Sequence, residues 1–344
     1  MARLVFAPLL LPFALLAPAC DDDPATGAPA GGDTADAGGG DGGGGGGGGS
    51  QSPPGEIALG PEQGLYVTDY AGALFHLSLE DGAVLGKYGT PGDGKDQYRE
   101  PTGVAATKKH LFVADRGNRR IVRLTVASGA GWSVLTPDAP TDPYGVAAYL
   151  SEDEKEETLL FSDYDGMQFF TVPASFDAAP VKGASLDGFN ACSVAIREDR
   201  ALGTAGCSSG LALNIVVSAS SGDRVYPPSA GTGELRRPDG IAFLPDGTLA
   251  IADTGNFRVL CVMGSSSGSF GKQGSEGDLE LLSIAAVAAD ARGRIFVADP
   301  SRKRIVRVDD CDGTNPKVIY EGETITQITG LAAVGPYPGV QATP

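Results

Sequence analysis

Gly247-Thr-Leu-Ala-Ile-Ala-Asp253 is a short apolar run that ends in an aspartate, and the same pattern recurs along most of the chain. The other copies are Gln63-Gly-Leu-Tyr-Val-Thr-Asp69, Lys109-His-Leu-Phe-Val-Ala-Asp115, Glu157-Thr-Leu-Leu-Phe-Ser-Asp163 and Gly293-Arg-Ile-Phe-Val-Ala-Asp299. In chain order their final aspartates lie 46, 48, 90 and 46 residues apart, and the gap of 90 leaves room for a weaker copy near Gly203-Thr-Ala-Gly206. Six copies of a unit of about 40–50 residues built from short strands predict an all-β fold, a six-bladed β-propeller with one four-stranded blade per copy.

A second recurrent segment, rich in small residues, precedes each Asp-closed run. Its copies are Glu56–Leu59, Gly103–Ala106, Gly145–Ala148, Ser193–Ile196, Gly240–Phe243 and Ala286–Ala289. We predict that they form the innermost strands, because small residues fit the crowded axis of a propeller. The Asp-closed run is then the second strand, a run such as Arg120–Leu124 the third, and a run such as Trp132–Leu135 the outer one.

Ring closure is open at this point, because a further segment of the inner type, Ile328–Val334, follows the sixth copy in phase with the repeat. Either this segment supplies the inner strand of the first blade, or Glu56–Leu59 does so and the C-terminal strand packs elsewhere. We favour the first alternative.

Three of the repeats resemble the NHL repeat. The residues that carry the resemblance are Tyr98-Arg-Glu-Pro-Thr-Gly-Val-Ala105 with Leu111-Phe-Val-Ala-Asp-Arg-Gly-Asn-Arg-Arg-Ile121, then Arg237-Pro-Asp-Gly-Ile-Ala242 with Ala252-Asp-Thr-Gly-Asn-Phe-Arg258, and Val297-Ala-Asp-Pro-Ser-Arg-Lys-Arg-Ile305. The resemblance covers about Pro54 to Gly335 and implies the propeller fold. It does not imply one function, because NHL propellers serve as binding platforms and as several unrelated enzymes. We expect the Asp-x-x-Asn-x-Arg pattern to stabilise the turn after the second strand, with the Arg bracing the Asp.

The N-terminal segment predicts export. Arg3 is followed by an apolar run, Leu4–Leu16, which is shorter than the ~20 residues that span a bilayer and has the layout of a signal peptide over residues 1–19. Leu16-Ala-Pro-Ala-Cys20 resembles a bacterial lipobox, and residues 20–54 form an acidic, Gly-rich tether that cannot bury a core. We therefore expect a lipid on Cys20, a lipid-anchored envelope protein, a propeller over residues 55–335 and a tail at 336–344. Cleavage after Ala17-Pro-Ala19 and plain secretion is the alternative.

Charge bears on the class of partner. The formal net charge is −17, which disfavours nucleic acid, because binding to phosphates depends on clustered cationic side chains. Basic clusters do occur, at Arg116/Arg119/Arg120/Arg123 and Arg302/Lys303/Arg304/Arg307. We interpret them as surface residues paired with local carboxylates, with an anion-binding patch as the alternative.

Four cysteines besides Cys20 make an even number in an exported chain, which favours disulfides. If the fourth inner hairpin turns at Glu198-Asp-Arg200, residues whose numbers sum to about 399 face each other, which pairs Cys192 with Cys207. Cys261 and Cys311 remain, on the third strand of the fifth repeat and just after that of the sixth. Their blades adjoin, so this bridge is plausible although the two positions are offset.

Catalytic constellations are sparse. The two histidines, His76 and His110, cannot supply a three-histidine zinc site, and we predict no cofactor or metal. We favour a non-enzymatic, monomeric binding propeller with a protein, peptide or glycan partner in the envelope. The alternatives are a lactonase-like hydrolase or lyase with an axial metal site, and a purely structural envelope protein.

The residues that we expect to bind lie on the face that carries the loops between second and third strands and the loops between blades. Tyr and Arg predominate there, as they do at binding hot spots. The candidates are Tyr70, Arg116, Asn118, Tyr164, Thr254, Asn256 and Arg302 from the first set of loops, and Tyr98, Arg99, Tyr144, Arg236 and Arg237 from the second. The opposite face includes the acidic hairpin 151–157, which we interpret as solvated surface.

Overall fold

The computed structural model describes residues 63–126, 131–135, 142–151, 154–163, 166–173, 181–187, 193–197, 200–204, 214–218, 235–263, 266–272 and 277–334. All of them belong to the second of two compact units, Ser50–Pro344, and Met1–Gly49 is the other. The predictions on the signal peptide, Cys20, the tether and the C-terminal tail fall outside the described residues. No helix within the described ranges is long and apolar enough to cross a membrane.

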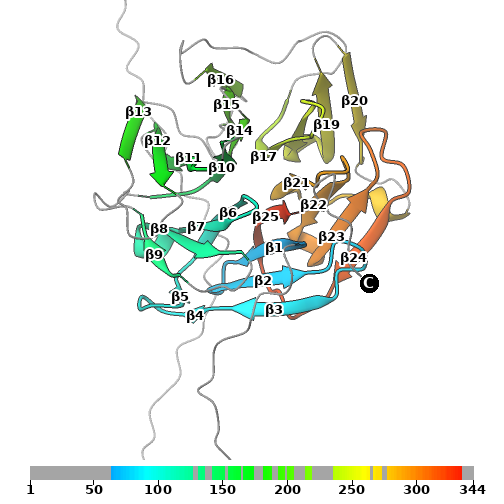
Figure 1. Ribbon diagram of the computed structural model, residues 1–344. Helices are drawn as coiled ribbons and strands as arrows, with labels where there is room; N and C mark the ends of the chain where they lie inside the picture. The colour runs from blue at the N-terminus through cyan, green and yellow to red at the C-terminus, as the bar shows by residue number, and fades with distance from the viewer. Residues whose placement is uncertain are drawn as a thin grey trace, which may run out of the picture. The chain divides into compact units, whose positions relative to one another are not determined.

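The described residues form six antiparallel sheets (Figure 1). The strand orders given below run from the innermost strand of each sheet outward. The first has the order β25 (Ile328–Val334), β1 (Gly64–Asp69), β2 (Ala73–Leu77), β3 (Val84–Tyr88), and the second β6 (Pro101–Ala106), β7 (His110–Asp115), β8 (Arg120–Thr125), β9 (Ser133–Val134). The third contains β10 (Val146–Leu150), β11 (Glu156–Asp163), β12 (Gly166–Pro173), β13 (Val181–Asp187), and the fourth β14 (Ser193–Arg197), β15 (Arg200–Thr204), β16 (Asn214–Ser218). The fifth contains β17 (Pro238–Phe243), β18 (Leu249–Asp253), β19 (Arg258–Met263), β20 (Ser266–Phe270), and the sixth β21 (Ala286–Ala289), β22 (Ile295–Asp299), β23 (Arg304–Val308), β24 (Lys317–Glu321).

Short elements fill the connections. A parallel pair, β4 (Thr90–Pro91) and β5 (Gln97–Tyr98), lies between the first and second sheets. Four 3-10 turns are η1 (Arg116–Asn118), η2 (Thr254–Asn256), η3 (Gly277–Leu279) and η4 (Pro300–Arg302). Three of these turns, η1, η2 and η4, follow the aspartate of the second strand, where the Asp-x-x-Asn-x-Arg pattern lies.

The inner strands contact one another in cyclic order. Strand β25 lies against β6, β6 against β10, β10 against β14, β14 against β17, β17 against β21, and β21 against β25. The all-β prediction is confirmed, and the arrangement of the sheets is propeller-like.

Each second strand is buried on both faces, because a neighbouring sheet covers each face. Strands β1, β7 and β22 are buried at every position. Alternate residues of β7 enter different cores: Leu111 and Val113 pack with the first sheet, and Phe112 and Ala114 pack with the third. This explains why the second strands have continuous apolar runs rather than an apolar–polar alternation.

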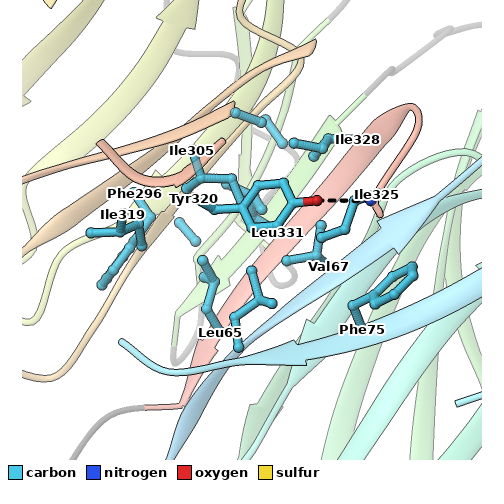
Figure 2. Close-up of a cluster of buried hydrophobic side chains, with 14 of the residues drawn as sticks. Leu65, Val67, Phe75, Phe296, Ile305, Ile319, Tyr320, Ile325, Ile328 and Leu331 are labelled. Carbon is cyan, nitrogen blue, oxygen red and sulfur yellow. Dashed lines mark hydrogen bonds between the residues drawn. The ribbon is translucent and has the colours of Figure 1, made fainter. Parts of the chain in front are cut away.

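The C-terminal strand closes the ring of contacts. Strand β25 pairs antiparallel with β1 over the full length of β1, from Gly64 opposite Val334 to Asp69 opposite Ile328. The favoured alternative for closure is therefore confirmed. Figure 2 shows the core beside it, where Leu65 and Leu331 of the first sheet meet Ile305 of the sixth. The Ile325 N–H donates to the Tyr320 hydroxyl (2.8 Å) and fixes the chain as it enters β25.

Glycine permits the inner strands to approach so closely. A Cβ at Gly330 of β25 would lie 2.6 Å from the Thr102 carbonyl oxygen of β6, and one at Gly103 would lie 2.7 Å from the Tyr144 carbonyl oxygen. One at Gly240 would lie 3.0 Å from backbone atoms of β21. Real Cβ atoms do not tolerate the first two distances, so any larger residue must push the two sheets apart.

One disulfide joins the fifth and sixth sheets. Cys261 of β19 and Cys311, after β23, are bonded, with their Cα atoms 5.8 Å apart. The prediction of a disulfide between them is confirmed, and the offset between the two positions is taken up by the turn at 309–313.

The register assumed for the fourth hairpin is wrong. Ser193 pairs with Thr204 and Arg197 with Arg200, so facing residue numbers sum to 397 rather than 399. The reason is that Arg197 pairs directly with Arg200, which leaves two residues between the strands instead of three. Cys192 and Cys207 lie outside the described residues.

Gly330→Ala should destabilise the fold, because its Cβ would meet backbone of the neighbouring inner strand. We expect a loss of roughly 1–3 kcal/mol in the free energy of unfolding, measured by urea denaturation. Gly322→Ala is the matched control, since its Cβ would find only the Tyr320 ring and hydroxyl, at 3.5 Å or more, and its effect should stay within about 0.5 kcal/mol. Equal effects of the two substitutions would contradict the role assigned to Gly330.

Candidate functional site

In the first, second, fifth and sixth sheets, the aspartate that ends the second strand anchors the loop that leads into the inner strand of the same sheet. One oxygen of Asp115 accepts the Arg99 N–H (2.7 Å), and the other accepts from Asn118 Nδ2 (2.9 Å) and Arg120 Nε (2.7 Å). Burial raises the pKa of Asp115, and these hydrogen bonds lower it. Asp115 is fully buried, so its charge serves the fold.

The same arrangement recurs in other sheets. Asp253 accepts the Arg236 N–H (2.7 Å) and is braced by Asn256 (2.8 Å) and Arg258 (2.7 Å). In the sixth sheet Asp299 accepts the Ser283 N–H (3.0 Å) and Arg304 Nε (3.2 Å). The Arg braces the Asp as predicted. In these sheets, however, the backbone N–H groups that donate to the aspartate lie in the loop before the inner strand and not in the turn after the aspartate.

Directly after each anchored loop, the inner strand carries one extra residue that has no partner of its own in the ladder. In β6 the register shifts between Pro101 and Val104, in β17 between Pro238 and Gly240, and β25 skips Thr329. The third and sixth sheets have the same pattern of two residues opposite one. The Tyr144 N–H donates to the Ser162 carbonyl oxygen, and Ser162 also bonds to Gly145, the residue after Tyr144. The Ala285 N–H donates to the Ala298 carbonyl oxygen, and Ala298 also pairs with Ala286. The five extra residues, which we call the bulge residues, are Thr102, Tyr144, Asp239, Ala285 and Thr329. A β-bulge re-aims a side chain and is common beside functional sites.

The bulge residues divide into two kinds. The Thr102 hydroxyl donates to the Tyr144 carbonyl oxygen (2.7 Å) and the Thr329 hydroxyl to the Pro101 carbonyl oxygen (2.8 Å), so both join one sheet to the next. Tyr144 and Asp239 instead carry functional groups that are only partly buried. Cys192 holds the equivalent place before β14 and lies outside the described residues.

Charged side chains surround these two residues. Arg116 forms a two-point ion pair with Asp142 (Nε–Oδ1 2.6 Å, Nη2–Oδ2 3.3 Å), and its guanidinium carbon lies 4.9 Å from the centroid of the Tyr144 ring. Arg237 Nε is 3.7 Å from Asp239 Oδ2, and the Arg237 side chain is 63% exposed. We call this set of Arg116, Asp142, Tyr144, Arg237 and Asp239 the Tyr144–Asp239 cluster.

Electrostatics tie the cluster together. Burial raises the pKa of Asp239 to about 6, although Arg237 and the Thr254 hydroxyl act to lower it. Burial also raises the pKa of Tyr144, where the charge of Arg116 opposes the shift and that of Asp239 adds to it. The two bulge residues therefore lie within electrostatic reach of each other. A carboxyl group whose pKa burial shifts this far is characteristic of functional sites.

The comparisons with known proteins agree with this geometry. The family model of the NHL repeat matches residues 235–262, which contain β17, β18, β19 and the Asp253 anchor. This part of the chain thus matches the NHL repeat, and the sheets around it have a propeller-like arrangement. No curated protein sequence matches the chain significantly.

Solved structures of similar fold differ widely from this chain in sequence. The nidogen/laminin complex matches at 14% identity and a TM-score of 0.60 over 79% of this chain and 98% of the other. A streptogramin B lyase matches at 15% identity and a TM-score of 0.52 over 82% and 89%. A protein of unknown function from Bacteroides caccae matches at 12% identity and a TM-score of 0.53 over 79% and 98%. At these identities the likeness shows the fold alone, and the fold is shared by a protein-binding propeller and a lyase.

The fold brings some of the expected binding residues together. Arg116, Tyr144 and Arg237 belong to the Tyr144–Asp239 cluster, and Tyr70 is close enough for its hydroxyl to influence the pKa of Arg116. Arg99 and Arg236 are exposed, while their backbones serve the aspartate anchors.

Other expected residues serve the fold. The Asn118 amide donates to Gly92 and Asp115, and Asn256 to Asp253. The Thr254 hydroxyl donates to the Ile284 carbonyl oxygen (2.6 Å), and Arg302 pairs with Glu280.

The prediction that Tyr98 lies on the binding face is wrong. Its side chain is fully buried, with its ring centroid 5.5 Å from that of Trp132 and 6.4 Å from that of Tyr88. The pairing of β4 with β5 turns this ring inward, away from the loop surface. Tyr164 lies outside the described residues.

The acidic hairpin 151–157 is not solvated throughout, which corrects a second expectation. Glu157 is fully buried, its Oε2 lies 2.6 Å from His110 Nδ1 of the second sheet, and its Oε1 accepts from the Thr107 hydroxyl (2.5 Å). The neighbouring sheet supplies polar partners, and these make the burial of the carboxylate possible. Within the described ranges, no group of three or more His, Cys, Asp or Glu side chains could hold a metal ion.

Most side chains of the basic clusters pair with local carboxylates, as predicted, but Arg123 and Arg304 are buried rather than on the surface. In the first, Arg116 pairs with Asp142 and Arg120 with Asp115, while the buried Arg123 donates to the Ser133 hydroxyl (3.3 Å). In the second, the ion pairs are Arg302–Glu280, Lys303–Glu323, Arg304–Asp299 and Arg307–Glu80.

Asp239 and Asp142 were not among the expected residues. The signal for Asp239 is its place directly before the Gly of the inner strand, where the other sheets have Thr, Tyr or Ala. The signal for Asp142 is its place two residues before Tyr144, which brings it to Arg116.

Asp239→Asn should stabilise the protein at neutral pH. The folded pKa of about 6 lies above the unfolded value near 3.9, so the ionised carboxylate destabilises the fold above about pH 6, and the cost disappears as the pH falls below about 4. We expect a gain of roughly 1–3 kcal/mol at about pH 7.5 that shrinks toward pH 4, measured by urea denaturation across this range. Asp93→Asn, at a side chain that is 80% exposed, is the control and should change little. A loss of stability in Asp239→Asn at neutral pH would show that the carboxylate serves the fold.

Proposed function

We propose that this protein is a six-bladed propeller that binds a partner in the bacterial cell envelope through the Tyr144–Asp239 cluster, and that a lipid on Cys20 holds it to a membrane. The six blades are supported by the six sheets and by the cyclic contacts of their inner strands, which the pairing of β25 with β1 completes.

The observation that carries the binding role is the half-buried Asp239, whose pKa burial raises to about 6. Its side chain is only 21% exposed and its Arg237 neighbour is 3.7 Å away, beyond hydrogen-bonding distance. The site therefore keeps a largely desolvated carboxylate and an exposed guanidinium side by side, in an ion pair without a direct hydrogen bond. Such a pair offers an acceptor and donors to a polar ligand.

Tyr144 and Arg116 add a recognition surface to this pair. Their stacked side chains, with Asp142 fixing the guanidinium, make a rigid aromatic and cationic wall. Rigid Tyr and Arg side chains are enriched at binding hot spots, because they combine a large contact area with directional hydrogen bonds. The similar nidogen/laminin structure is a complex of two proteins, which favours a protein partner for a propeller of this fold. We propose a protein, peptide or glycan partner for this chain.

An enzymatic role is the second candidate, and the same residue favours it. A carboxyl group with a pKa near 6 is suited to general acid–base catalysis near neutral pH. One of the similar structures is a lyase, which makes a lyase or hydrolase the class to consider. A ligand that returns chemically unchanged from the bound state would favour binding over this alternative.

Site-specific photo-crosslinking tests the binding role. The full chain is expressed in its host with a benzoylphenylalanine at position 237, or at position 134, an exposed site on the outer strand of the second sheet, and irradiated in intact cells. We expect a discrete crosslinked product from position 237 alone, and a yield several-fold lower when Asp239→Asn is added. Equal products from both positions, or an unchanged yield with Asp239→Asn, would refute the assignment.

Lipid attachment is tested separately. Mass spectrometry of the mature protein should find an N-terminal acylated cysteine, and Cys20→Ala should release the protein from the membrane fraction. An unmodified N-terminus on a freely soluble product would leave secretion as the alternative.

A further inference from the structure

A groove of about 530 Å³ lies between the fifth and sixth sheets. The hairpins after β17 and β21, at 244–248 and 291–293, form part of its lining. Because the bulge residues lie at the start of these inner strands and the hairpins at their end, the groove is at the opposite end of the sheets from the Tyr144–Asp239 cluster. Its volume falls within the usual range for ligand sites, about 300–1,000 Å³.

The walls of the groove are fixed before any ligand arrives. The Gly247 N–H donates to Leu244 (3.0 Å), the Gly293 N–H to Asp290 (3.0 Å), and the Gly313 N–H to Asp310 (3.1 Å), so each turn is closed by its own hydrogen bond. The Cys261–Cys311 disulfide, which is part of the lining, ties the two sheets together at this place. A preformed site loses little conformational entropy on binding.

The charges of the groove are predominantly negative. Four aspartates line it, Asp246, Asp309, Asp310 and Asp312, against the single arginine Arg292. Arg292 already pairs with Glu80 (3.2 Å).

Uncharged groups donate hydrogen bonds to two of these aspartates. Asp310 accepts from the Thr314 hydroxyl (2.6 Å) and from the Asp312 and Thr314 amides, and Asp309 accepts from the Asn315 amide (2.8 Å). Hydrogen bonds of this kind lower the pKa of Asp310 and leave its charge in place. The groove therefore presents carboxylates that keep their negative charge, because their hydrogen-bond donors are uncharged.

Apolar surface accompanies these charges. Met263 is 53% exposed at the edge of the groove, and Pro245 and Ala291 line it beside Met263. A flexible thioether adapts to different ligands. Lys and Arg side chains combine an apolar stem with a cationic end, which matches this combination of surface.

We propose that this groove is a second binding site, which takes a basic peptide segment of a partner protein, with its cationic ends on the carboxylates at 309–312 and its apolar stems on Met263. Charge complementarity selects the occupant, and the closed turns and the disulfide hold the groove open for it. The site is independent of the Tyr144–Asp239 cluster, so either can fail without the other.

The test uses the full-length protein and a fluorescent peptide of alternating Lys and Leu, with the Glu–Leu peptide as its counterpart, in anisotropy titrations. We expect the Lys peptide to bind and the Glu peptide not to bind. Asp312→Lys should weaken binding roughly tenfold, because it replaces an attraction by a repulsion. Gly268→Phe should also weaken it by filling the groove, since a Cβ there is 3.4 Å from the nearest atom and needs no backbone movement.

Asp93→Lys is the matched control, because it makes the same change in charge at an exposed position that does not line the groove. If Asp93→Lys and Asp312→Lys weaken binding alike, the attraction comes from the net charge of the whole chain and the proposal is overturned. Equal binding of the Lys and Glu peptides overturns it too. If an equal concentration of spermidine displaces the peptide, the groove binds a small organic cation and not a peptide segment, and the proposal is overturned. Melting temperatures of the variants show that each is folded, and Asp312→Lys remains decisive if Gly268→Phe does not fold.

Discussion

The close approach of the inner strands is the constraint on which the rest of the structure depends. Gly330 and Gly103 each face backbone of the next inner strand at distances that exclude a Cβ. Because the inner strands meet backbone to backbone, the larger side chains of the second and third strands can pack between neighbouring sheets farther out. Each sheet is thus buried on both faces by its neighbours, and no sheet can bury its apolar surface alone.

This dependence makes closure of the ring the decisive step of folding. Strand β25 comes from the C-terminal end of the described chain and completes the sheet that begins with β1. The core beside it joins Leu65 and Leu331 of the first sheet to Ile305 and Tyr320 of the sixth, so the first and last repeats share one apolar cluster. A chain that ends before β25 would leave the first sheet without its inner strand and the sixth sheet without a cover. We infer that the propeller gains most of its stability only when the last strand is in place.

The repeat pattern in the sequence predicts the strands well, because each Asp-closed run must be apolar to lie between two sheets. It also predicts closure by residues 328–334, since that segment is in phase. The pattern does not predict where single side chains point. Tyr98 was assigned to the surface because it lies in a loop, but a short parallel pair turns it into the core. Glu157 was assigned to solvent because its neighbours are acidic, but His110 and Thr107 of another sheet receive it.

The sequence pattern does not predict Asp239 for a related reason, and this reason connects the repeat motif with the candidate site. In the fifth sheet the Asp, Asn and Arg of the motif are used for anchoring, as Asp253, Asn256 and Arg258 show, so the fold already engages their side chains. The bulge residue that follows the anchored loop has no ladder partner of its own, so the strand pairing does not specify its side chain. It is Thr, Tyr, Asp or Ala in the described sheets, which differ in size, charge and hydrogen bonding. The aspartate anchor fixes the backbone of the loop, whereas the bulge position accepts different side chains. This division lets the propeller carry a costly, partly buried carboxylate at one bulge position while the other sheets keep the ring closed.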